Sequence, residues 1–208
     1  MIAIIDYGVG NLRSVEKALQ YLKFEAIITN DPKVVLEAEK VILPGVGAFG
    51  KSMESLKQAG MIPVVKEVIQ SGRPFLGICL GLQMLFEASA EVFGDQERVH
   101  SGLGIFPGQV LRFPKNGLKT PQIGWNQIKK NRARETPLLD GVPDGSFVYF
   151  VHSYYVKPEN PEFIACTTDY GVEYCSGVSW GNVTAFQFHP EKSGRVGLQI
   201  LKNFGEIK

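Results

Sequence analysis

The sequence lacks both a strong net charge and a long hydrophobic run, the features typical of nucleic-acid-binding and membrane proteins. Lys and Arg total 22 and Asp and Glu total 21, so the net charge at neutral pH is only +1. No electrostatic footprint for nucleic acid or an anionic membrane follows from that balance. The densest basic stretch, residues 129–134, is interpreted as a solvated loop or strand end. Because no run of 18 apolar residues occurs, no transmembrane helix is predicted, and we expect neither nucleic acid nor a membrane as a partner.

Cysteine is also scarce. Cys79, Cys166 and Cys175 are an odd number and lack the spacing of metal ligands, so we predict no metal site, and nothing in the sequence calls for a cofactor. No signal peptide precedes the first predicted strand. We therefore expect a cytoplasmic protein in which all three thiols are free.

The chain has no internal repeat, low-complexity segment or linker. Its 208 residues, of which 44% are hydrophobic and 21% charged, fit one domain with a sizeable core. Strands are predicted in the first half at residues 1–5, 24–28, 41–43 and 74–78. Helices are predicted between them at residues 11–23, 49–59 and 62–70, with a further short helix that begins at Asp31-Pro32. This alternation predicts a parallel sheet covered by helices on both faces.

The second half of the chain changes character. Runs with a period of two predict strands at residues 109–113, 146–156, 163–168 and 183–188, several of them antiparallel or mixed. Helical spacing of apolar residues predicts a last helix at residues 193–204. The predicted fold class is α/β, a single-domain open sheet that is mixed but mainly parallel.

A cysteine between glycines carries the strongest chemical signal. Gly77-Ile78-Cys79-Leu80-Gly81 follows an apolar run and opens the apolar-periodic stretch 80–86, which predicts a strand, a sharp turn that holds a nucleophile, and a helix. The glycines permit a strained turn. The start of a helix would lower the pKa of the thiol from about 8.5 and favour the thiolate. The alternative for Cys79 taken alone is a buried, unreactive thiol.

A second motif, His189-Pro190-Glu191, supplies an imidazole and a carboxylate two residues apart. With Cys79 it predicts a Cys-His-Glu triad, in which His189 transfers protons and Glu191 orients the imidazole. Taken alone, His189 could be a satisfied core histidine and Glu191 a surface glutamate. His152 could act as a second catalytic base, but its position at the end of an aromatic strand favours a structural role.

Three unusual segments follow predicted strands: residues 44–47, the turn at Cys79 and the His-Pro-Glu turn. Because ligands bind outside the carboxyl ends of parallel strands, we expect these segments to form one active site. The backbone N–H groups of Leu80 and Val46 are the predicted oxyanion donors. The competing interpretation of residues 44–50, a phosphate-binding loop, lacks the Walker lysine and Ser/Thr.

Two segments resemble those of class I, triad-type glutamine amidotransferases, namely FLGICLGLQ at 75–83 and QFHPE at 187–191. More selective segments resemble the glutaminase subunits of imidazole glycerol phosphate synthases, enzymes of histidine biosynthesis. These are DYGVGN at 6–11, LPGVGAFG at 43–50, GWN at 124–126 and VHSYY at 151–155. The resemblance covers about residues 1–205, with no departure at the motif positions. It implies a flavodoxin-like glutamine amidotransferase type 1 domain over residues 1–208.

The resemblance implies an enzyme that hydrolyses glutamine to glutamate and ammonia through a thioester on Cys79. Gln83 is expected one helical turn after Cys79 on the same face, where it would bind the substrate's α-amino or carboxylate group. Gly47, Ser153 and Tyr154 are expected to complete that pocket. The loop around Val46 is where such glutaminases are thought to be gated by their partner.

A glutaminase with no synthase domain on its own chain implies a partner that receives ammonia. The resemblance makes that partner a TIM-barrel cyclase, joined as a heterodimer, which forms imidazole glycerol phosphate and aminoimidazole carboxamide ribotide. Asn11, Trp125 and Lys192 are the predicted partner face. Their alternative roles are a helix cap, a core aromatic and a solvated charge.

Other functions remain open from the sequence alone. The same turn and triad occur in cysteine peptidases and related hydrolases, which need no partner. An amidotransferase paralogue that serves another pathway is a second alternative. The third, a catalytically inactive binding module, is disfavoured by the presence of Cys79, His189, Glu191 and Gln83 together.

Overall fold

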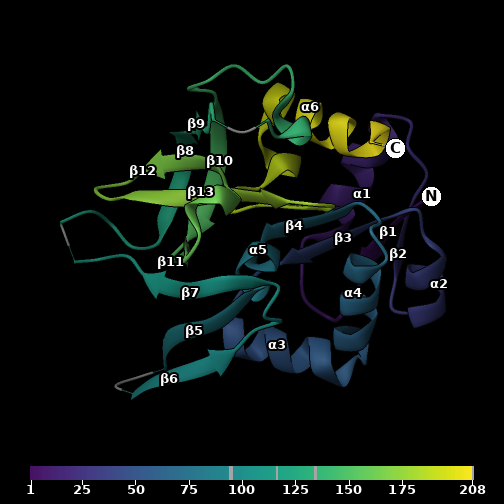
Figure 1. The fold of residues 1–208 in the computed structure, drawn as a ribbon, viewed down its shortest axis with the longest axis horizontal. Helices are drawn as coiled ribbons and strands as arrows, with labels where there is room; N and C mark the ends of the chain where they lie inside the picture. The colour runs from purple at the N-terminus through teal and green to yellow at the C-terminus, as the bar shows by residue number, and fades with distance from the viewer. Residues whose placement is uncertain (94–95, 116, 134, 208) are drawn as a thin grey trace.

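A mixed β-sheet runs through the centre of the computed structural model, which describes residues 1–93, 96–115, 117–133 and 135–207 (Figure 1). Arg134, the last residue of the basic stretch, therefore lies outside the described residues. Five strands in one half of this sheet are parallel. In spatial order they are β2 (Ala26–Thr29), β1 (Ile2–Ile5), β3 (Lys40–Gly45), β4 (Phe75–Cys79) and β14 (Val183–Phe186). The predicted parallel sheet is thus confirmed.

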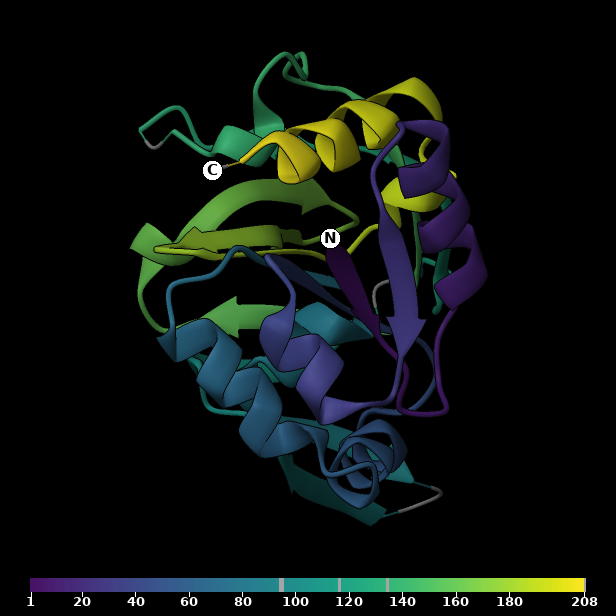
Figure 2. The same ribbon diagram turned by 90° about the vertical axis from the view of Figure 1, so that its right-hand side faces the viewer.

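Helices cover both faces of the parallel strands, as predicted (Figures 1 and 2). One face carries α1 (Leu12–Tyr21) and α6 (Gly194–Glu206). The other carries α2 (Pro32–Glu37), α3 (Phe49–Gln58) and α4 (Met61–Gln70). The N-cap predicted for the short helix is present, because the Asp31 side chain accepts a hydrogen bond from the backbone N–H of Lys33 at 2.9 Å.

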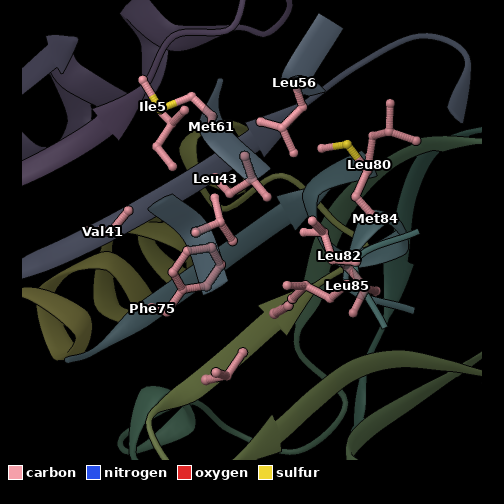
Figure 3. Close-up of a cluster of buried hydrophobic side chains, with 14 of the residues drawn as sticks. Ile5, Val41, Leu43, Leu56, Met61, Phe75, Leu80, Leu82, Met84 and Leu85 are labelled. Carbon is pink, nitrogen blue, oxygen red and sulfur yellow. The ribbon is translucent and has the colours of Figure 1, made fainter. Parts of the chain in front are cut away.

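Strand alternation divides the buried side chains between two cores. Ile2 and Ile4 of β1 pack with the residues of α1 and α6, whereas Ala3 and Ile5 pack with those of α2, α3 and α4. Figure 3 shows the second of these cores, in which Ile5 and Leu43 lie near Met61. Because both faces are covered, the strands have the continuous apolar composition of a buried parallel sheet.

The other half of the sheet is mainly antiparallel, in agreement with the change of pattern in the sequence. Beyond β14 it continues through β13 (Glu173–Trp180), β11 (Tyr154–Pro158), β7 (Phe106–Arg112), β5 (Phe86–Phe93) and β6 (Gln96–Ser101). The short strands β12 (Ile164–Asp169) and β9 (Lys129–Lys130) pair outside this path. Of these pairs only β5 with β7 is parallel. Three 3₁₀ turns complete the described elements: η1 (Pro137–Leu139), η2 (Pro161–Phe163) and η3 (Pro190–Lys192).

The helix expected over residues 80–86 is shorter than predicted. Helix α5 spans Leu80–Met84, and β5 begins at Phe86. The carbonyl of Met84 accepts from the backbone N–H of Leu103, and the carbonyl of Leu85 accepts from Ile105 and Phe106. These bonds draw the chain into the sheet in place of another helical turn.

The strand predicted over residues 146–156 is in fact two strands in different sheets. β10 (Phe147–His152) pairs with β8 (Gln122–Gln127) in a separate two-stranded sheet, whereas β11 belongs to the main sheet. The chain bends at Ser153, whose carbonyl accepts from the backbone N–H of Phe113 at 3.1 Å. No helix among the described residues combines the length and apolarity needed to cross a membrane.

Two isoleucines of the parallel strands should differ in their contribution to the free energy of unfolding. Ile42 of β3 is fully buried, whereas Ile27 of the edge strand β2 is 40% exposed. We expect Ile42→Ala to lower the free energy of unfolding by about 2–5 kcal/mol, because it leaves a cavity in a closed core. Ile27→Ala should cost much less, since its side chain is already partly in water. Urea denaturation of both variants tests this, and equal losses would contradict it.

Candidate active site

A cavity of about 390 Å³ lies where β3 and β4 end and where the chain leaves β14. The residues predicted from the sequence that line it are Val46, Gly47, Cys79, Leu80, Gln83, Ser153, Tyr154 and His189. Four residues not assigned to the site line it as well: Glu91, Pro121, Val151 and His152. The structure therefore brings together six separate parts of the chain, at the edge of the sheet where ligands of such folds bind.

The backbone at Cys79 has the strained conformation expected of a nucleophile turn. Its φ is 55° and its ψ is −108°, a combination that costs an L-residue about 1–3 kcal/mol and persists only where the surroundings enforce it. Close packing on both sides explains the two glycines. A Cβ on Gly77 would stand 2.8 Å from the Cβ of Ala185, and one on Gly81 would overlap the carbonyl oxygen of Leu43.

Cys79 is 5% exposed. Its thiol lies between two polar groups. The Nε2 atom of Gln187 donates to Sγ over 3.7 Å, and the carbonyl oxygen of Val151 on β10 lies 4.0 Å from Sγ. Neither contact was predicted, although Gln187 belongs to the QFHPE segment and could have been singled out from it. Val151 carries no signal in the sequence, because its contact is made by the backbone.

His189 and Glu191 form the buried pair that their spacing predicts. His189 Nδ1 lies 2.8 Å from Glu191 Oε1, and the two side chains are 2% and 1% exposed. A carboxylate only accepts hydrogen bonds, so Nδ1 carries a proton and Nε2 is the atom available to exchange one. Nε2 is buried and has no hydrogen-bond partner among the described residues.

The environment of His189 favours its protonated form. Burial alone would lower the pKa of the imidazole, but the adjoining Cys79 and Glu191 side chains outweigh burial and raise the pKa above its usual value. The raised pKa allows His189 to hold a proton within the cavity.

Asn11 contributes to the same cluster. It occupies the N-cap position of α1, but its side chain makes no capping hydrogen bond. Its Nδ2 atom instead lies 3.5 Å from Glu191 Oε1, behind the imidazole. The structure thus places Asn11 against Glu191 rather than in the helix-cap role that was its alternative.

The loop that carries Val46 is held at both of its ends. The hydroxyl of Tyr7, a residue of the DYGVGN segment, donates to the carbonyl of Pro44 at 3.0 Å. At the other end the Glu91 carboxylate accepts from the backbone N–H groups of Phe49 and Gly50 at 3.0 and 2.9 Å. Between them Gly47 has a φ of +90°, which favours glycine.

Glu91 is the one carboxylate among the residues that line the cavity, and it is 7% exposed. The sequence gives no local signal for it, because it lies mid-strand in β5, twelve residues after the cysteine. Strand β5, which the sequence analysis did not predict, carries it beside the loop, where it accepts from the backbone of Phe49 and Gly50.

Gln83 is fixed by two acceptors. Its Nε2 atom donates to the carbonyl of Tyr154 at 2.9 Å and to Oε1 of Gln187 at 3.0 Å. His152 Nδ1 lies 2.8 Å from the same Tyr154 carbonyl, and its Nε2 lies 3.2 Å from the Tyr174 hydroxyl. Burial lowers the pKa of His152 to about 4, so it is neutral at physiological pH and supports the backbone of the pocket.

The three residues predicted to face a partner lie around one rim of the site. Trp125 on β8 is 55% exposed, so it is not a core residue, and its ring meets Tyr149 edge-on at 6.1 Å. Lys192 Nζ lies 5.8 Å from the centre of the Tyr149 ring. Asn11 is partly buried and lies against Glu191.

A strained cysteine turn and a buried His–Glu pair thus meet at one edge of an open α/β sheet. The chain matches the family described as glutamine amidotransferase class-I over residues 3–207, and it belongs to that family. Solved structures agree on the fold. The chain resembles the Thermotoga maritima PurLQS structure, with a TM-score of 0.74, 18% identity and coverage of 98% of this chain and 96% of that one.

Relatives found by sequence share a higher identity with this chain than that structure does. The chain is 54% identical to imidazole glycerol phosphate synthase subunit HisH of Geobacter sulfurreducens, over 100% of this chain and 99% of that protein. It is 53% identical to the subunit HisH of Bacillus cereus, over 98% and 93% of the two chains. For the same subunit of Aquifex aeolicus the identity is 50%, over 97% and 94%.

The site predicts which thiol reacts. All three cysteines are free and buried, but burial raises the pKa of Cys166 to about 12 and that of Cys175 still further above its usual range. We expect a glutamine analogue that bears an electrophile to label Cys79 and to spare the other two, because only Cys79 opens onto the cavity beside a proton acceptor. Peptide mapping of the folded protein measures this. Cys79→Ser is the control and should remain unlabelled, whereas labelling of all three thiols would contradict the assignment.

Proposed function

We propose that this chain is the glutaminase subunit of an imidazole glycerol phosphate synthase. It hydrolyses glutamine to glutamate and ammonia. It delivers the ammonia to a cyclase subunit, which makes imidazole glycerol phosphate and aminoimidazole carboxamide ribotide in histidine biosynthesis. Whole-length identity of 50–54% to subunits of that name supports this function. The domain extends over residues 1–208, and the cytoplasm is the proposed location because all three thiols are free.

One observation carries the chemistry. Cys79, at a positive φ of 55°, and His189, paired to Glu191 at 2.8 Å, line a single buried cavity although 110 positions separate them in the sequence. A structural cysteine needs no strained backbone, and a satisfied core histidine would not leave Nε2 without a partner. Cys79, His189 and Glu191 are therefore proposed as the catalytic triad.

The proposed reaction has two stages. The Cys79 thiolate attacks the side-chain carbonyl carbon of glutamine, while the thiol proton lies on His189 Nε2. That proton passes to the departing amide nitrogen, so that ammonia leaves and a γ-glutamyl thioester remains. Water then attacks the thioester with His189 as the base, which releases glutamate and returns the proton to the thiol. Glu191 holds the Nδ1 proton throughout and stabilises the imidazolium.

The oxyanion that forms in both stages needs donors at its position. Leu80 is the first residue of α5, so its N–H has no partner within the helix. We assign it and the N–H of Val46 as the two donors. The position of Val46 between a loop end held by Tyr7 and one held by Glu91 makes that loop a natural place for gating by the partner.

The rest of the cavity fits the amino-acid end of glutamine. Gln83, Gly47, Ser153 and Tyr154 are the proposed contacts, and the pocket's volume is within the range of small-ligand sites. Glu91 adds a buried negative charge that complements the substrate's α-ammonium group. The sequence-based assignment of this pocket is thus extended by one residue.

The partner is a cyclase subunit, proposed to be a TIM barrel bound as a heterodimer. Ile123, Trp125 and Phe147 on the β8–β10 sheet are 63%, 55% and 54% exposed, an unusual concentration of large apolar side chains. They lie beside Lys192 and Tyr149, next to the triad. This surface, together with Asn11 beneath it, is the proposed partner face.

The same family serves other pathways, so a specialised paralogue is the first alternative, and a partner-independent cysteine hydrolase is the second. The exposed apolar surface favours a chain that works in a complex. Glutamine turnover with and without the cyclase and its nucleotide substrate separates the alternatives. Strong turnover by the isolated chain would favour the independent hydrolase.

Removal of the nucleophile tests the division of labour. We expect Cys79→Ala to abolish glutamine-dependent synthesis in the complex but to leave synthesis from ammonium salts intact, because the cyclase requires only ammonia. Product formation is measured with each nitrogen source. A mutant complex that also fails with ammonium would overturn the proposal, provided that the two subunits still co-purify.

Replacement of the other two triad members should give a ranked loss. Glu191→Gln can still accept a hydrogen bond from His189 but cannot stabilise its charge, whereas His189→Ala removes both the base and the acid. We expect kcat for glutamine hydrolysis to fall in the order wild type, Glu191→Gln, His189→Ala, the last by about 10³-fold or more. Near wild-type turnover in His189→Ala would exclude histidine, and with it the triad.

A further inference from the structure

The free edge of β10 contacts both reactive residues. In the antiparallel β8–β10 pair, Tyr149 lies opposite Trp125 and Val151 lies opposite Ile123. The backbone groups of Tyr149 and Val151 are directed away from β8, as those of alternate residues in such a pair are. The carbonyl of Val151 faces the thiol of Cys79 at 4.0 Å, and the carbonyl of Tyr149 accepts from the backbone N–H of His189 at 3.0 Å.

The backbone N–H of Tyr149 is bound by a side chain. It donates at 3.0 Å to Oγ of Ser193, and that hydroxyl donates in turn to the carbonyl of His189 at 2.6 Å. Ser193 is 2% exposed. Its hydroxyl therefore completes a bridge in which both the N–H and the C=O of His189 are tied to one residue of β10.

The position of Ser193 makes this arrangement unusual. Ser193 is the N-cap of α6, where a serine hydroxyl ordinarily accepts from a backbone N–H of the first helical turn, but it makes no such capping bond. The 13-residue helix α6 therefore lacks the stabilisation of a side-chain cap, and the Ser193 hydroxyl instead binds the carbonyl of His189. Gly197 packs against the carbonyl of Pro190 so closely that a Cβ there would overlap it, which keeps α6 pressed on the same turn.

We propose that Ser193 is a positioning residue for glutamine hydrolysis, whose hydroxyl fixes the His189 backbone on β10 and so sets the imidazole relative to Cys79. The inference rests on the proposed function, because it assumes that His189 exchanges protons with Cys79. It adds a role for a residue that touches neither substrate nor the reacting atoms.

The same bridge links the chemistry to the proposed partner face. Tyr149, which the bridge holds by its backbone, carries a ring that meets Trp125 edge-on and lies beneath Lys192 Nζ. A partner that displaces the outer face of the β8–β10 sheet therefore acts on the strand that holds His189 and faces Cys79. Ser193 makes that strand and the His-Pro-Glu turn move together.

The test compares Ser193→Ala with Ser179→Ala in the complex with the cyclase. Ser179 is a matched control, since it is a buried serine, 5% exposed, with its Oγ 3.2 Å from the Thr184 hydroxyl and outside the lining of the active-site cavity. We expect Ser193→Ala to lower kcat for glutamine about 10- to 100-fold, because a small displacement of a catalytic group is costly. KM should change by less than about threefold, since the substrate contacts are intact. Ser179→Ala should keep wild-type kcat.

A second readout separates positioning from a general loss of stability. The rate at which iodoacetamide alkylates Cys79 is measured against pH in the isolated chain. If Ser193 sets the imidazole beside the thiol, the profile of Ser193→Ala should move to higher pH, whereas that of Ser179→Ala should match wild type. Ser193→Thr, which keeps the hydroxyl, should recover most of the lost kcat. If Ser193→Ala does not fold, Ser193→Thr is compared with Ser193→Val, which differs from it only in the hydroxyl.

The outcomes are distinguishable. Wild-type kcat and an unmoved alkylation profile in Ser193→Ala, or equal kcat in Ser193→Thr and Ser193→Val, would overturn the role of Ser193 and leave the proposed function standing. A wild-type complex that turns over no glutamine would overturn the proposed function itself. Synthesis from ammonium, which bypasses the triad, should be unchanged in every Ser193 variant.

Discussion

The left-handed backbone at Cys79 is the constraint on which the rest of the site depends. With φ at 55° and ψ at −108° the residue would relax if its neighbours allowed it. Gly77 packs against Ala185 of β14 and Gly81 against the carbonyl of Leu43 on β3, so the two strands that flank β4 press on the turn from either side. These strands also lead into the loop that carries Val46 and into the His-Pro-Glu turn. The packing that maintains the strain therefore assembles the reactive groups.

A second constraint comes from a part of the molecule outside the main sheet. The β8–β10 pair presents apolar side chains outward, while the free edge of β10 binds His189 through Tyr149 and faces Cys79 through Val151. Backbone hydrogen bonds between strands leave little freedom along the strand, so Cys79 and His189 both contact one rigid element. The proposed partner face and the proposed triad are thus linked through the same strand.

The sequence predicted the parts of the structure that depend on local pattern. The parallel strands, the helices on both faces and the N-cap at Asp31 follow from apolar periodicity and turn chemistry, and the cysteine turn follows from two glycines. What escaped prediction depends on long-range pairing. The helix after Cys79 ends at Met84 because carbonyls there bond to residues 103–106, and the break at Ser153 separates two sheets. Glu91 and Ser193 have neighbours that no spacing in the sequence indicates.

Two histidines near the cavity show how environment separates roles that residue type cannot. His152 has a backbone carbonyl at one nitrogen and the Tyr174 hydroxyl near the other, and burial lowers its pKa to about 4. His189 is also buried, but a carboxylate on Nδ1 and the adjacent thiol raise its pKa. The pKa values of the two histidines are thus shifted in opposite directions. Such a difference indicates which of them suits acid–base chemistry, because a residue that transfers a proton must first be able to hold it. The neutral imidazole of His152 contacts the Tyr154 carbonyl, which Gln83 also binds, whereas His189 is the histidine proposed to exchange a proton with Cys79. The Cys79 thiol and the Glu191 carboxylate make that difference, and Asn11 Nδ2 lies 3.5 Å from the same carboxylate.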